Sequence, residues 1–135
     1  SSDVCSSDLL LGTTEWNSDQ LFQRGGRYVE GSLFPGGLNL ASQNPTQMTF
    51  IKNYNAAFGT NPDLLASQAY EAMSVAVSAL KLSNSADRNE MVNFLTQQNG
   101  FSSPLGSQIS FDTNRVAKRT VPIFKLNSNG AIVQQ

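Results

Sequence analysis

The sequence contains no histidine and a single cysteine, Cys5, among its 135 residues. Without histidine it lacks the commonest acid-base group at neutral pH and the commonest metal ligand in proteins. Its acidic residues are scattered, and no two have the spacing of a metal site or of a glycosidase carboxylate pair. No serine lies in a Gly-x-Ser-x-Gly elbow. We therefore expect no catalytic residue, no bound metal and no cofactor in this chain, and we predict that it is not an enzyme.

Charge and long apolar runs are also scarce. Nine basic residues stand against ten acidic ones, and the basic residues form no stripe that would neutralise a row of phosphates. No apolar run approaches the ~20 residues needed to span a bilayer, and the N-terminus lacks the basic start and apolar centre of a signal peptide. We expect a globular protein that has no nucleic-acid partner.

The first nine residues, 1–9, resemble the translation of a common sequencing-library adapter. We expect them to be a non-native leader and exclude them from the reasoning about the fold; the alternative is a natural Ser-rich leader. Because Cys5 lies within this segment, the native part would then offer no thiol for catalysis, disulfide formation or metal binding. An adapter joined to Leu10 also predicts that the native protein continues upstream and that residues 10–135 are a fragment of it.

The first forty residues predict a strand, a helix and a second strand. Leu10 and Leu11 resemble the end of a buried strand, which a polar turn over residues 12–17 follows. Ser18 is placed to cap a short helix that Gly25-Gly26 ends. Residues 27–34 have a β-like pattern that ends at a Pro-Gly-Gly sequence.

Three helices are predicted next from their start signals. The signals are Asn44 followed by Pro45, Asn61-Pro62-Asp63, and Asp87 with Glu90 three residues later. The second helix, from about Pro62 to Leu82, is apolar or small nearly all round, so we expect it to be buried on several sides.

The last thirty residues change to a strand-like period. Residues 108–111 alternate, residues 112–114 form a polar turn, and residues 120–126 alternate again around Pro122. Proline lacks a backbone N–H, so Pro122 belongs at an edge or at the start of a strand. A turn over Asn127-Ser128-Asn129-Gly130 then returns the chain through residues 131–133. These patterns predict an α/β chain with a β-rich end.

Three stretches of the sequence resemble, in the same order, the receptors that bind branched-chain amino acids and related ligands for ABC transporters. They are Leu11-Gly12-Thr13 through Trp16-Asn17 to Tyr28-Val29-Glu30-Gly31; Ala69-Tyr70-Glu71-Ala72 to Ala79-Leu80; and residues 106–112 followed by Val121 to Val133. The chain after Leu10 thus resembles the C-terminal part of a periplasmic binding protein of type I. Asn114 stands where many relatives have Gly; asparagine tolerates the left-handed turn conformation, so this departure bears on the turn more than on the ligand site.

The resemblance implies a fold and a function. The fold class would be α/β, the incomplete C-terminal part of a two-lobed fold, with residues 10–135 belonging to a periplasmic ligand-binding domain. The function would be extracytoplasmic solute binding in a bacterium, with an amino acid or similar small polar molecule held between two lobes for an ABC transporter permease. Lipid anchoring through an upstream segment is a further expectation. Two alternatives stay open: a lipoprotein that binds a cell-wall synthase, similar to the activators of penicillin-binding proteins, and the ligand-sensing domain of a receptor.

The best candidate for the ligand site is the turn from Thr13 to Asn17, because open α/β sheets bind ligands at the carboxyl ends of their strands. The hydroxyls of Thr13 and Thr14 can hold a carboxylate, Glu15 can pair with an ammonium, and Trp16 can cover an apolar side chain. The alternative is a solvated turn with Trp16 packed against its lobe.

The family's helix motif adds a second candidate for the ligand site. Tyr70 and Glu71 belong to this motif, and we include Tyr70 among the candidate ligand-binding residues. The alternative is a core tyrosine beside a surface glutamate.

Overall fold

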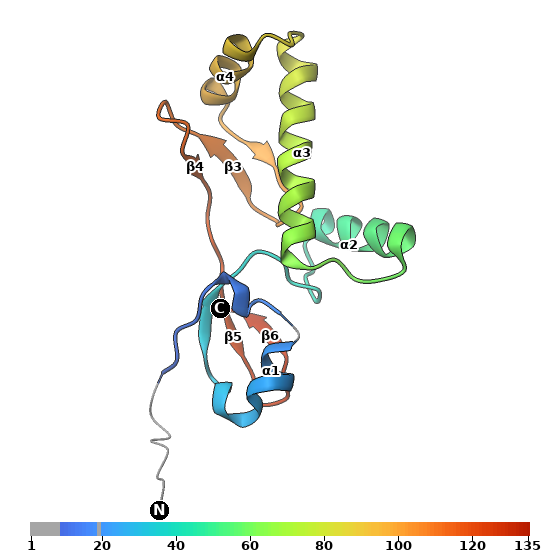
Figure 1. The fold of residues 1–135 in the computed structure, drawn as a ribbon, viewed down its shortest axis with the longest axis vertical. Helices are drawn as coiled ribbons and strands as arrows, with labels where there is room; N and C mark the ends of the chain where they lie inside the picture. Colours follow the sequence, from blue (N-terminus) through green and yellow to red (C-terminus); the bar gives the residue numbers. More distant parts are fainter. Residues whose placement is uncertain (1–8, 19) are drawn as a thin grey trace, which may run out of the picture. The chain divides into compact units, whose positions relative to one another are not determined.

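The computed structural model describes residues 9–18 and 20–135 (Figure 1). The expected leader lies outside this part of the chain except for Leu9, as does Cys5. The described residues form two compact units, which we call unit 1 and unit 2. Unit 1 comprises the chain up to Asn39 together with Pro122–Gln135, and unit 2 is Leu40–Val121. The chain therefore leaves unit 1 once and returns to it once.

Unit 1 is a three-stranded antiparallel sheet with short helical segments packed on it. Its strands β1 (Leu33–Pro35), β5 (Ile123–Leu126) and β6 (Ile132–Gln134) lie in the order β1-β5-β6. The preceding helical segments are the 3-10 turn η1 (Thr14–Trp16), helix α1 (Gln20–Gly25) and the 3-10 turn η2 (Gly26–Val29). The buried core consists of Phe34, Phe124 and Leu126, and the partly buried apolar side chains around it are Trp16, Leu21, Phe22, Val29 and Ile132.

The predicted strand, helix and strand are present in unit 1 in a short form. Leu11 bridges Leu33 in a parallel arrangement, in which the Leu33 N–H donates to the Leu10 carbonyl at 2.9 Å. The hydroxyl of Ser18 accepts from the Gln20 N–H at 3.2 Å, which confirms the predicted cap of α1. The burial predicted for Leu10 and Leu11 is wrong, since 38% and 74% of their surfaces are exposed.

The second strand of unit 1 begins later than predicted. Residues 27–29 belong to the 3-10 turn η2, and β1 starts only at Leu33. The turn begins at Gly26, whose φ is +55°, and Gly31, which follows it, has a φ of +76°. Two left-handed glycines interrupt the extended backbone that the alternation of side chains alone predicted. The strand start predicted for Pro122 is confirmed, because β5 begins at the next residue.

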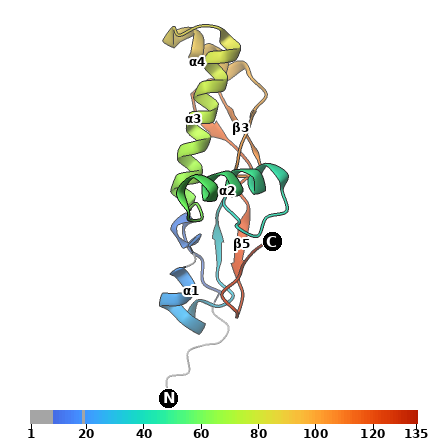
Figure 2. The ribbon, with the colours of Figure 1, turned by 90° about the vertical axis from the view of Figure 1, so that its right-hand side faces the viewer.

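Unit 2 contains three helices and a second small antiparallel sheet, against which two of the helices pack. The helices are α2 (Pro45–Phe58), α3 (Leu64–Ser83) and α4 (Arg88–Gln97), and the sheet has the order β2 (Phe101–Ser102), β3 (Gln108–Phe111) and β4 (Ala117–Lys118). Both views show β3 beside the long helix α3 (Figures 1 and 2). The core consists of Val75, Phe101 and Ile109, with Phe94, Leu95 and Phe111 packed around it. None of the described helices is long and apolar enough to cross a membrane.

The helix starts of unit 2 follow the predicted capping signals. The Asn44 side chain accepts from the backbone N–H of Thr46 at 3.0 Å, and the Asp87 side chain accepts from that of Asn89 at 2.8 Å. The start of α3 is shifted from the prediction. Its cap is Asp63, whose carboxylate accepts from the Ala66 N–H at 2.7 Å. Because the helix begins after Asp63, Pro62 lies before it. The carboxylate oxygen caps the first turn by the same kind of contact that an amide oxygen makes.

The burial predicted for α3 on several sides is wrong. Its buried residues form one stripe at four-residue spacing: Ser67, Glu71, Val75 and Ala79. Other apolar side chains, such as Leu65 at 74% and Met73 at 65%, are exposed. Val75 of this stripe packs in one core with Phe101 and Ile109 of the β2–β3 hairpin, and Phe94 and Leu95 of α4 pack against that core.

The turn after β3 takes a left-handed conformation at Arg115, where φ is +66°, and not at Asn114. The Asp112 carboxylate fixes this turn by accepting from the backbone N–H groups of Asn114 at 2.9 Å and Val116 at 3.0 Å. These hydrogen bonds, first that from Val116, hold the pKa of Asp112 below its ordinary value. Arg115 lies between the two donors and takes the strained conformation.

Arg115→Gly is expected to raise the free energy of unfolding of unit 2 by about 1 kcal/mol. A side chain in the left-handed region costs roughly 1–2 kcal/mol, and the greater freedom of glycine in the unfolded chain offsets part of that gain. Urea denaturation followed by circular dichroism measures the change. Asn114→Gly is the matched control, because Asn114 has no positive φ. An equal or larger gain from Asn114→Gly would contradict the assignment.

Candidate functional site

The predicted ligand turn forms the 3-10 turn η1 at the end of the segment that bridges β1. Thr13, Thr14 and Glu15 are exposed, and Trp16 is partly buried. The hydroxyl of Thr13 donates to the Glu15 carboxylate at 2.6 Å. The four residues predicted here therefore lie together in unit 1, with the carboxylate held by its neighbour.

The indole of Trp16 packs against the core of unit 1. Its ring also lies directly over Gly12, where an added Cβ would stand 2.2 Å from the indole Cδ2 atom. Gly12 thus determines where the indole lies, a role that sequence reasoning missed although the glycine stands four residues before the tryptophan. The packing agrees with the alternative reading of Trp16, while part of the side chain stays accessible.

Asn17 fixes the other end of the turn. Its side-chain amide donates to the Leu38 carbonyl at 3.0 Å, and its backbone N–H donates to the Thr14 carbonyl at 3.0 Å. The first bond ties η1 to the segment that follows β1, and the second closes the turn itself. No sequence pattern indicates the first bond, because 21 residues separate its partners. The result is a turn held at both ends, which presents polar side chains to solvent.

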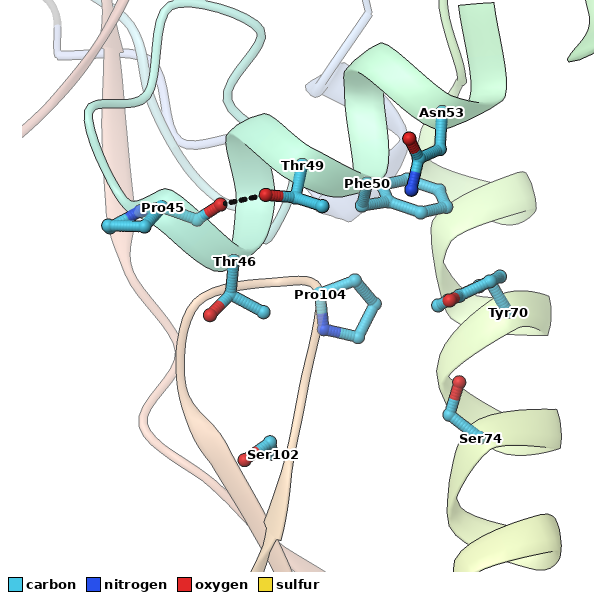
Figure 3. Close-up of a pocket in the computed structure, with 9 residues that line it drawn as sticks. All are labelled: Pro45, Thr46, Thr49, Phe50, Asn53, Tyr70, Ser74, Ser102 and Pro104. Carbon is cyan, nitrogen blue, oxygen red and sulfur yellow. Dashed lines mark hydrogen bonds between the residues drawn. The ribbon is translucent and has the colours of Figure 1, made fainter. Parts of the chain in front are cut away.

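Tyr70 belongs to unit 2 and lines a pocket there of about 450 Å³ (Figure 3). Its side chain is 55% exposed, and its ring centroid lies 4.9 Å from that of Phe50. The close-up shows Tyr70 and Ser74 pointing from α3 into the space beside Pro104. The lining residues are Pro45, Thr46, Thr49, Phe50, Asn53, Tyr70, Ser74, Ser102 and Pro104.

The chemistry of this pocket is neutral. None of its lining residues is charged, and the Thr49 hydroxyl already donates to the Pro45 carbonyl at 2.8 Å. Aromatic and proline rings with a few hydroxyls suit an uncharged group. The pocket offers no partner of opposite charge to an ammonium or a carboxylate, so the turn around Glu15 is the better candidate for holding an amino acid.

The alternative reading of the helix motif, a core tyrosine beside a surface glutamate, is reversed in the structure. Tyr70 is exposed, and Glu71 is buried with 6% of its surface accessible. One carboxylate oxygen of Glu71 accepts from Arg119 Nη1 at 2.7 Å, and the other accepts from the Ser103 hydroxyl. Sequence reasoning assigned no role to Arg119, which lies 48 residues away from its partner.

Neither described unit assembles a metal centre. No group of three His, Cys, Asp or Glu side chains lies close enough to hold a metal ion in the part of the chain that the structure describes. The candidate site therefore consists of hydroxyl, carboxylate and aromatic groups, which can bind a ligand by hydrogen bonds, ion pairing and apolar contact.

Comparison with known proteins identifies one family and several similar solved structures. The sequence model of the family described as "Periplasmic binding protein" matches residues 8–131. No curated protein sequence matches the chain. Among solved structures, the leucine binding protein of Thermotoga maritima is 25% identical, with a TM-score of 0.75 over 96% of this chain.

Two further solved structures contain a ligand. An ABC transporter substrate-binding protein from Desulfitobacterium hafniense in complex with leucine is 17% identical, with a TM-score of 0.74 over 97% of this chain. A solute binding protein from Rhodopseudomonas palustris in complex with 3,4-dihydroxybenzoic acid is 21% identical, with a TM-score of 0.75 over 94% of the chain. The chain spans 36–37% of the length of these three proteins. The likeness confirms the predicted fold class, an incomplete part of a two-lobed fold.

Proposed function

The chain belongs to the periplasmic binding protein family, and we propose that it is part of a solute-binding protein that delivers a small carboxylate-bearing ligand, an amino acid first, to an ABC transporter permease. The family match over residues 8–131 carries this proposal. Membership implies an extracytoplasmic location, and the family consists of solute-binding proteins and not of enzymes. Anchoring by a lipid at an upstream segment belongs to the proposal as well.

The ligands of the solved relatives support the proposed ligand class. The protein from Desulfitobacterium hafniense holds leucine, and two from Rhodopseudomonas palustris hold 3,4-dihydroxybenzoic acid and benzoate. All three ligands carry a carboxylate, but leucine alone carries an ammonium group. A site that prefers amino acids must therefore add a group that pairs with the ammonium, and a carboxylate side chain is the natural partner.

The turn η1 supplies side chains of the required kinds. We assign the ligand carboxylate to the hydroxyl of Thr14 and the ligand ammonium to Glu15, and Thr13 acts through Glu15 because its one hydroxyl proton is donated to that carboxylate. The hydrogen bond of 2.6 Å from Thr13 supports this, because it holds the Glu15 carboxylate before a ligand arrives. The accessible part of Trp16 covers the apolar side chain of the ligand, and Tyr70 stays a separate candidate for an aromatic contact in the pocket of unit 2.

Glu15→Gln is expected to weaken leucine binding by about 2 kcal/mol, roughly thirtyfold, and to leave benzoate binding unchanged. The substitution removes a charge-assisted hydrogen bond that leucine makes and benzoate does not. Calorimetric titration of the whole protein, as its cell produces it, measures both affinities. The fluorescence of Trp16, the only tryptophan, gives a second readout in the turn itself.

Glu30→Gln is the matched control, because Glu30 is an exposed glutamate of unit 1 outside the turn. It should leave both affinities unchanged. Equal weakening of leucine and benzoate by Glu15→Gln would remove Glu15 from the ammonium site. If the unaltered protein bound neither amino acids nor aromatic acids, the transport proposal would fail, and the lipoprotein that binds a cell-wall synthase or the ligand-sensing domain would replace it.

A further inference from the structure

The loop between β2 and β3, residues 103–107, receives side-chain contacts from both segments that connect the two units. On the way into unit 2, the Asn44 side chain donates to the Gly106 carbonyl across 3.5 Å. On the way back, Arg119 Nη2 donates to the Ser107 hydroxyl at 3.2 Å. Asn44 lies five residues after Asn39, the last residue of unit 1 before the crossing, and Arg119 lies three residues before Pro122, where the chain re-enters unit 1. One loop of unit 2 thus holds both connections close to where they leave it.

The loop is itself fastened to helix α3 by buried polar groups. The Ser103 hydroxyl donates to the Glu71 carboxylate and accepts from the Leu105 N–H at 3.0 Å. Ser103 is 3% exposed and Glu71 is 6% exposed. Hydrogen bonds shielded from water hold their geometry more firmly than exposed ones, because a broken bond leaves an unsatisfied buried group.

In the segment that leads back to unit 1, Arg119 is the residue that contacts Glu71 and the β2–β3 loop. From Thr113 to Val121 every residue is exposed except Arg119, whose side chain is 20% accessible. Its guanidinium reaches Glu71 with one nitrogen at 2.7 Å and Ser107 with the other at 3.2 Å. The neighbouring ion pair of Lys118 with Asp112 spans 3.6 Å, and the Lys118 side chain is 66% exposed, so it contributes little.

We propose that Arg119 is a positioning residue, which Glu71 and Ser107 hold so that the connection from unit 2 back to unit 1 keeps one path. Only a guanidinium has two N–H-bearing nitrogens in a fixed fork, so lysine cannot satisfy both partners at once. The anchoring follows from the contacts of unit 2 alone. The importance of this anchoring for ligand capture rests on the proposed function, because a binding protein that closes on its ligand needs connecting segments that start from fixed positions.

Backbone ¹⁵N relaxation of the whole chain tests the anchoring without any ligand. In the unaltered protein the order parameters of residues 119–121 should be close to those of rigid backbone, about 0.85. Arg119→Met should lower them below about 0.6 while α4 and β5 keep their values. Arg119→Lys should restore part of the order. Lys118→Met, which removes the adjacent exposed charge, should change nothing in this segment.

Ser107→Ala is a second variant that leaves the Glu71 pair in place. It should lower the order parameters of the same three residues by a smaller amount, and it keeps the test decisive if Arg119→Met does not fold. Equal effects of Arg119→Met and Lys118→Met would overturn the proposal, as would a loss of order that spreads evenly over unit 2. These outcomes are independent of ligand titration, so failure of the anchor and failure of the proposed function are distinguished.

Discussion

Phe124→Ala is expected to lower the free energy of unfolding of unit 1 by about 3–5 kcal/mol, the usual cost of replacing a buried phenylalanine by alanine. Phe124 is fully buried in the central strand β5, and its ring centroid lies 6.3 Å from that of Phe34. Its ring also lies over Gly36, where an added Cβ would come within 2.3 Å of it. Among the described residues this core has three buried side chains, so the cavity has few neighbours that can move to fill it.

The two units give separate spectroscopic signals for this experiment. Trp16 is the only tryptophan and packs on the core of unit 1, whereas the three long helices belong to unit 2. Chemical denaturation of Phe124→Ala should therefore shift the fluorescence midpoint more than the circular dichroism midpoint at 222 nm. Coincident shifts would mean that the units unfold as one cooperative body.

Ile123→Ala is the control, because it also replaces a large apolar side chain of β5 by alanine. Ile123 precedes Phe124 in the same strand, and its side chain is 43% exposed. Its replacement leaves no buried cavity, so the expected cost is below about 1 kcal/mol. If both substitutions cost the same, the core assigned to unit 1 is not what stabilises it.

The parts of the fold that could be predicted are those in which cause and effect are close in the sequence. The caps at Asn44 and Asp87 act on backbone groups two or three residues away, so the local pattern was sufficient. The turn from Asn127 to Gly130 is equally local, closed by the Asn127 N–H bonding to the Ala131 carbonyl at 2.9 Å. Local chemistry also placed the polar turn η1, although which of its side chains meet a ligand stays a prediction.

The parts that escaped prediction depend on contacts between distant residues. Periodicity showed that α3 is apolar, yet its buried stripe includes Glu71 because Arg119 and Ser103 reach it from far along the chain. The left-handed residue after β3 has a local cause that residue type alone does not indicate. The hydrogen bonds of Asp112, and not the preferences of Asn114, determine which residue takes that conformation.

Arg119→Met is expected to cost about 3 kcal/mol of stability in unit 2, and Glu71→Met about 1–2 kcal/mol. The asymmetry follows from exposure. Without Arg119 the Glu71 side chain, 7% accessible, keeps a buried charge with no cation beside it. Without Glu71 the guanidinium, 20% accessible, can turn partly toward water. Urea denaturation followed by circular dichroism measures both losses.

The double variant Glu71→Met/Arg119→Met separates the value of the pair from the cost of breaking it. Because it leaves no unpaired charge, we expect it to be more stable than Arg119→Met alone, with a coupling energy of about 1–3 kcal/mol. The exposed pair of Lys118 and Asp112 is the matched cycle, and its coupling should stay below about 1 kcal/mol. A double variant less stable than either single variant would show that the two side chains stabilise unit 2 through separate contacts, and the ion pair would then not be the anchor of the connection at Arg119.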